Sequence, residues 1–68
     1  MEFNLNENEF IELNKLLKLS GLAESGGFAN FVITEGNVLL NGVIETRKRK
    51  KLYKGDVVTF QGNDISIL

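Results

Sequence analysis

The chain has 68 residues, of which 43% are hydrophobic and 25% are charged, with a formal net charge of -1; this composition is ordinary for a globular domain and unlike that of a disordered chain. It contains no histidine or cysteine, so zinc sites, disulfides and catalysis by a cysteine or histidine lack the residues they need. No apolar run approaches the roughly 18 residues of a membrane span, and no signal peptide is recognisable, so we expect one cytoplasmic domain over residues 1–68 that is not an enzyme and holds neither metal nor cofactor.

The first predicted elements are a short strand and a helix. Phe3-Asn4-Leu5 alternates apolar and polar residues, which is typical of a strand. Asn6 stands three residues before Glu9, as in a capping box, and the apolar residues that follow recur at helical spacing. We therefore predict a helix from Glu9 to Leu19. Its apolar face consists of Phe10, Leu13, Leu16 and Leu17.

A second helix is predicted from Gly26 to Glu35, with Ser25 as its N-cap. Its apolar face consists of Phe28, Ala29, Val32 and Ile33. Gly26 and Gly27 in the first turn weaken helix propensity by about 1 kcal/mol each relative to alanine. Two explanations stay open: the second helix approaches the first closely across a backbone without Cβ atoms, or bare amides at the helix start bind a phosphate.

From Val38 onward the apolar pattern changes from helical to strand-like. Asn41-Gly42 separates two apolar runs, which predicts a hairpin with a type I′ turn, because that turn needs positive φ at both central residues. A turn at 54–56, a strand at 57–60, a polar turn at 61–64 and a last strand at 65–68 follow. The predicted fold class is therefore α+β, with two helices packed on a small antiparallel sheet.

Charge is divided unequally along the chain. Residues 1–46 carry seven acidic side chains and two lysines, whereas residues 47–68 carry six basic and two acidic side chains. Five consecutive cations, Arg47-Lys48-Arg49-Lys50-Lys51, repel one another, and no acidic residue is interleaved with them. In an extended segment their side chains would alternate between two sides. The run is either a surface for a polyanion or a solvated edge strand whose charge prevents aggregation.

A polyanion surface could bind nucleic acid, a membrane or an acidic protein. A membrane is the weakest candidate, because the apolar face of the first helix is needed for the core. Lys15 and Lys18 point in the same direction from that helix and extend the positive charge. Tyr53, just after the cations, could stack on a base, although a lone tyrosine is more often a half-buried sheet residue. Nucleic acid and an acidic protein both remain open.

Several short motifs occur together in a recognisable order. They are Leu16-Leu17-Lys18, Ser25-Gly26-Gly27, Ala29, Glu35-Gly36-Asn37-Val38, Asn41-Gly42, Glu45-Thr46-Arg47-Lys48, Lys51-Leu52 and Gly55-Asp56-Val57-Val58. In this order the chain resembles the RNA-binding domain named after ribosomal small-subunit protein four, and in particular its stand-alone bacterial branch of YbcJ-like and YaaA-like proteins. The resemblance extends from Phe10 to Val58.

The resemblance implies an alpha-L motif, in which two helices and a hairpin meet structured RNA such as rRNA or a tRNA-like molecule. It also implies a ribosome or another nucleic-acid-associated complex as a partner. In many larger members the serine at the start of the second helix precedes a basic residue; Gly26 stands there in this chain. We therefore predict an RNA-binding module, with docking of its basic edge on an acidic protein as the alternative. The RNA-binding residues we predict are Lys15, Lys18, Ser25, Gly26, Gly27, Arg47, Lys48, Arg49, Lys50 and Lys51.

Overall fold

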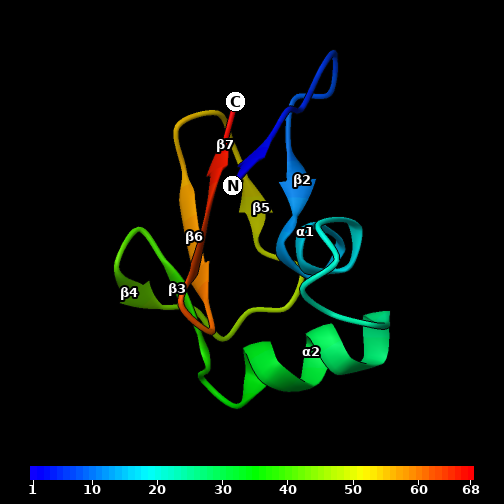
Figure 1. Ribbon diagram of the computed structural model, residues 1–68, viewed down its shortest axis with the longest axis vertical. Coiled ribbons are helices and arrows are strands. Elements are labelled where there is room, and N and C mark those ends of the chain that lie inside the picture. Colours follow the sequence, from blue (N-terminus) through cyan, green and yellow to red (C-terminus); the bar gives the residue numbers. More distant parts are fainter.

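The computed structural model describes residues 1–68 and consists of a sheet with two helices packed beside it (Figure 1). The elements in chain order are β1 (Glu2–Phe3), β2 (Ile11–Glu12), α1 (Leu13–Leu19), α2 (Gly26–Thr34), β3 (Val38–Leu40), β4 (Val43–Ile44), β5 (Lys51–Leu52), β6 (Val57–Phe60) and β7 (Asn63–Ile67). Five strands form the main sheet in the order β1-β7-β6-β3-β4, and β2 and β5 form a separate two-stranded sheet. The predicted α+β class is confirmed.

The main sheet joins the two ends of the chain. β1 pairs with β7 in parallel, with Glu2 opposite Ser66 and Phe3 opposite Ile67, whereas every other strand pair is antiparallel. The sheet is thus mixed rather than purely antiparallel, because a strand at the start of the chain can reach the last strand in either direction without a tight turn.

The hairpin at Asn41-Gly42 forms as predicted. Leu40 lies opposite Val43, and the φ angles of Asn41 and Gly42 are 51° and 82°, the left-handed values that a type I′ turn requires. A second tight turn at residues 61–62 has similar positive φ angles, 50° at Gln61 and 78° at Gly62. It allows the last strand to begin at Asn63, two residues earlier than predicted.

The prediction that the first helix begins at Glu9 is wrong, since α1 begins at Leu13. Ile11–Glu12 pairs instead with Lys51–Leu52 as the two-stranded β2-β5 sheet. The amides of Leu13 and Asn14 then donate to the carbonyl oxygens of Lys50 and Lys48, at 2.9 and 3.0 Å. These long-range bonds satisfy the first amides of α1, so no local capping box is needed.

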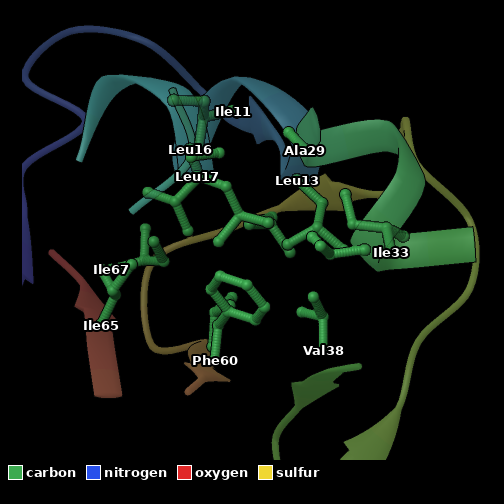
Figure 2. Close-up of a cluster of buried hydrophobic side chains, with 14 of the residues drawn as sticks. Ile11, Leu13, Leu16, Leu17, Ala29, Ile33, Val38, Phe60, Ile65 and Ile67 are labelled. Atoms are coloured by element: carbon green, nitrogen blue, oxygen red, sulfur yellow. The ribbon is translucent and has the colours of Figure 1, made fainter. Parts of the chain in front are cut away.

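The core lies between the helices and the main sheet (Figure 2). All 15 buried residues are apolar; Leu13, Leu16 and Leu17 of α1 are fully covered, and Phe60 of β6 packs beneath them. Burial of each large side chain stabilises the fold by about 1.5–3 kcal/mol. The predicted apolar face of α2 needs one correction: Phe28 is 40% exposed, because it lies on the flank of the helix rather than over the core. Neither helix has the length and apolar character needed to cross a bilayer.

Candidate nucleic-acid interface

Residues 47–51, which we call the basic turn, consist of a turn over residues 47–50 and the first residue of β5, rather than the extended segment considered above. The amide of Lys50 donates to the carbonyl oxygen of Arg47 at 3.1 Å, which closes the turn. The carbonyls of Lys48 and Lys50 point toward the start of α1, where they accept the two hydrogen bonds described above. The same segment therefore forms its own turn and satisfies the first two backbone amides of α1.

Both arginines of the basic turn are paired with carboxylates. Arg47 binds Glu45 through two hydrogen bonds, from Nε to Oε2 at 2.9 Å and from Nη2 to Oε1 at 3.0 Å. The Nε of Arg49 donates to Oε2 of Glu12 at 3.1 Å. No acidic residue is interleaved with the cations in the sequence, but these two carboxylates relieve part of their repulsion in the folded chain. The two guanidinium side chains nevertheless remain 69% and 75% exposed, so they stay open to a partner on their outer side.

The Arg47–Glu45 pair shifts the titration of the carboxyl group. The side-chain hydrogen bonds from Arg47 lower the pKa of Glu45 to about 2, against a smaller opposing effect of burial. The Glu45 side chain is only 12% exposed, which limits screening of the pair by water. Glu45 is therefore charged at neutral pH and cancels part of the positive field of Arg47.

The lysines carry the remaining positive charge of this surface. None of the six lysines of the chain has a carboxylate within 4.0 Å; the five of this surface are Lys15, Lys18, Lys48, Lys50 and Lys51. The Nζ of Lys51 lies 4.8 Å from the centre of the Phe10 ring, and the Tyr53 ring is tilted against Phe10 at 6.0 Å between centroids. A shallow depression is lined by Arg47, Arg49, Lys50, Lys51 and Tyr53.

Two asparagines connect the helices at this surface. Asn14 of α1 donates from Nδ2 to Oδ1 of Asn30 on α2 at 3.0 Å. Both side chains are half-buried, and the Asn14 Oδ1 also accepts from the amide of Lys15 at 2.8 Å. The backbone amide of Asn14 also donates to the carbonyl oxygen of Lys48. Asn14 therefore contacts the basic turn, the first turn of α1 and the middle of α2.

The start of α2 has the predicted N-cap. The Ser25 Oγ accepts from the amide of Phe28 at 3.1 Å, whereas the amides of Gly26 and Gly27 have no carbonyl one turn earlier to bind. A Cβ added at Gly26 would meet no atom within 4 Å, and one added at Gly27 would meet only the Ser25 Oγ at 3.9 Å. Close approach of the two helices, the first explanation for these glycines, is therefore wrong.

The predicted residues lie on adjoining segments. From the basic turn, the bonds through Asn14 and Asn30 lead to α2. Asn30 follows Gly26 by four residues and therefore shares its side of the helix, and Lys18 follows Asn14 by four residues on α1. Lys15 and Lys18 are both exposed, as predicted. The structure thus brings the basic turn and the predicted parts of both helices to one region, rather than to opposite ends of the molecule.

Four residues of this region were not predicted. Glu45 stands two residues before Arg47, so local pairing was a signal that could have been used. Glu12 is 37 residues from Arg49. The Asn14–Asn30 bond joins two asparagines, a residue type that is usually predicted to be exposed. Neither contact can be predicted from neighbouring residues in the sequence. No group of three or more acidic residues is arranged to hold a metal ion.

Comparison with known proteins identifies the family. The family model described as S4 domain matches residues 3–68. YbcJ of Escherichia coli (strain K12) is 42% identical over 66 residues, covering 97% of this chain and 94% of YbcJ. The probable ribosome maturation protein RlbA of Bacillus subtilis (strain 168) is 41% identical over 56 residues, covering 82% of this chain and 79% of RlbA.

A solved structure agrees with this assignment. The solution structure of E. coli YbcJ, described as revealing an alpha-L motif involved in RNA binding, is 42% identical and superimposes with a TM-score of 0.75. The match covers 98% of this chain and 85% of the YbcJ chain. The two helices and hairpin described above thus have the arrangement of the alpha-L motif, and the chain belongs to the S4 domain family.

Proposed function

We propose that residues 1–68 act as one RNA-binding domain that recognises structured RNA through its phosphates and its shape. The observation that carries this proposal is the set of hydrogen bonds that hold the basic turn against α1 and α1 against α2. Because of these bonds, cations from separate parts of the sequence are held in fixed positions on one region. A flexible basic tail would lose more conformational entropy on binding.

Phosphates are the natural ligands of this region. Exposed lysines supply point charges, and the free outer donors of Arg47 and Arg49 can bind phosphate oxygens. The free amides of Gly26 and Gly27 at the start of α2 suit a further phosphate. Duplex RNA exposes phosphates and 2′-hydroxyls but hides its base edges in a deep, narrow groove, so such a rigid surface distinguishes RNA mainly by shape.

The class of RNA we propose is rRNA or a tRNA-like fold, in the cytoplasm. The name of RlbA refers to ribosome maturation, and YbcJ is described as having a motif involved in RNA binding; both support this choice for a chain of the same family. Docking of the basic edge on an acidic protein, the alternative stated above, is not favoured by these relatives. We propose no catalytic step for the domain.

Salt dependence of binding to a hairpin RNA tests the proposal. For contacts with about four to six phosphates, log affinity should fall with log salt at a slope of about -3 to -5. Fluorescence anisotropy at several salt concentrations measures the slope. A slope near zero, or no binding, would contradict phosphate recognition.

Single charge changes make the test specific to the surface. Lys50→Gln should weaken binding and reduce the slope by about one, because Lys50 lines the depression in the basic turn. Glu45→Gln should strengthen binding because it releases Arg47 and removes a negative charge. Lys54→Gln is the matched control, since Lys54 is exposed but lies outside the depression. Equal effects of Lys50→Gln and Lys54→Gln would show that only net charge matters.

A further inference from the structure

A groove lies between the N-terminal loop, residues 4–9, and α1. Its volume is about 450 Å³, within the roughly 300–1,000 Å³ of small-ligand sites. Its lining includes Phe3, Asn6, Asn8, Phe10, Lys15 and Leu19. We call it the N-terminal groove, and the proposed phosphate contacts described above do not use its loop side.

The apolar wall of the N-terminal groove includes surface that the core does not require. Leu19, the last residue of α1, is 65% exposed. Phe3 packs partly against the core, and Phe10, which also contacts Lys51 and Tyr53, is half-buried. Exposed apolar surface of this kind is suited to the face of a nucleobase, because every base has a π-face that stacks on aromatic or apolar groups.

The opposite side of the groove supplies polar groups. The loop is held in shape by its own bonds, from the Asn6 amide to Asn4 Oδ1 at 2.7 Å and from the Asn8 amide to the Leu5 carbonyl at 3.0 Å. The Asn6 carboxamide forms no hydrogen bond within the protein, and Asn8 uses only its Nδ2. A carboxamide offers both donors and an acceptor, which is what the edge of a base requires.

The groove opens directly onto the proposed phosphate surface. Lys15 and Arg49, two of the predicted RNA-binding residues, line its rim. Glu12, the only acidic residue of the lining, is neutralised by Arg49 at 3.1 Å. A nucleotide whose phosphate is held by Lys15 or Arg49 can therefore place its base in the groove without facing an uncompensated carboxylate.

We propose that the N-terminal groove binds the base of an unpaired nucleotide that leaves a structured RNA beside the phosphates held by Lys15 and the basic turn. The base stacks on the apolar wall and bonds to the carboxamides of Asn6 and Asn8. This inference rests on the proposed function and adds to it: the preferred RNA has a bulge or a helix junction, not an uninterrupted stem. Sequence-specific RNA recognition generally uses unpaired bases of this kind.

The test uses a series of hairpin RNAs that differ only in a single unpaired 2-aminopurine nucleotide, placed at successive positions along the stem. Anisotropy gives the affinity, and 2-aminopurine fluorescence reports the surroundings of the base. At one or more positions the unpaired nucleotide should raise affinity by about fivefold or more, the effect expected for one stacked base, and its fluorescence should change on binding.

Two variants in the groove and one control outside it assign the effect to the groove. Leu19→Glu places a carboxylate in the apolar wall and should abolish the preference for the bulged RNA; Val43→Glu, at an equally exposed apolar residue on β4, adds the same charge outside the groove and should keep it. Asn6→Gly removes the carboxamide, tolerates the positive φ of 57° at this residue, and should reduce the preference. Circular dichroism checks that each variant is folded.

The outcomes separate this inference from the proposed function. If the protein binds every hairpin with equal affinity and normal salt dependence, or if Leu19→Glu keeps the preference, the groove does not bind a base and the phosphate surface stands. If no hairpin is bound, the proposed function itself has failed.

Discussion

Arg47 and Arg49 are each positioned by a carboxylate that the fold holds nearby. Glu45 and Glu12 are only 12% and 18% exposed, whereas the guanidinium side chains that they bind are mostly exposed. Because the guanidinium groups are open to solvent, each pair contributes at most about 1 kcal/mol to stability. Their clearer consequence is to fix the direction of each guanidinium and reduce its net charge, so the unpaired lysines provide most of the positive field.

The Glu45–Arg47 pair should make the stability of the fold depend on pH. Because the folded pKa of Glu45 is lowered to about 2 from its ordinary value of 4.5, the pair stabilises the fold fully above about pH 4.5 and loses this contribution as the pH falls toward 2. Urea unfolding of the wild type and of Arg47→Gln at pH 7 and pH 3 measures the effect. The wild type should lose more stability between these two pH values; equal losses would contradict the pairing.

Substitutions at Gly26 and Gly27 should change stability and RNA binding in opposite directions. The space around a Cβ at either position is open, so Gly26→Ala and Gly27→Ala should each raise the free energy of unfolding by up to about 1 kcal/mol through helix propensity. If a phosphate approaches these amides, the added methyl group should at the same time weaken RNA binding. Thermal melts and anisotropy test the two effects together; a variant that is more stable and binds equally well would remove this phosphate contact.

Among the elements, those with local signals were predicted well. Asn41-Gly42 specified its hairpin because only a few residues accept two consecutive positive φ angles. Ser25 indicated the start of α2 because its side chain caps the first turn of that helix. The start of α1 was misjudged because Phe10 continues the helical spacing of Leu13 and Leu17, although the residues between Phe10 and Leu13 form β2. The choice is made by pairing with Lys51–Leu52, some 40 residues away, which no local pattern reveals.

The bond between α1 and α2 should be measurable as a coupling energy. Asn14→Ala and Asn30→Ala should each lower the free energy of unfolding by about 1 kcal/mol, because each leaves the other half-buried carboxamide without its partner. In a double-mutant cycle the two should be non-additive, with an interaction of about 0.5–1.5 kcal/mol. Additive losses would mean that the asparagines do not hold the helices together.

In the whole molecule, the candidate site combines segments that lie far apart in the sequence. The charge of the basic turn was evident from composition, and its neighbourhood with α1 followed from the family resemblance. The conformation and the ion pairs of the basic turn could not be predicted, because they depend on contacts such as Arg49–Glu12 that form only when the chain is folded. The N-terminal groove likewise arises where the first loop meets α1 and the basic turn.

Mapping of amide chemical shifts with a hairpin RNA tests the central claim most directly, namely that one surface formed by the basic turn and the helices binds RNA. In a titration of ¹⁵N-labelled protein, the largest perturbations should occur in residues 14–18, 25–27 and 47–51, while β4 and the Gln61-Gly62 turn should change little. Perturbations centred on β4 or on that turn, with residues 47–51 unaffected, would contradict the account.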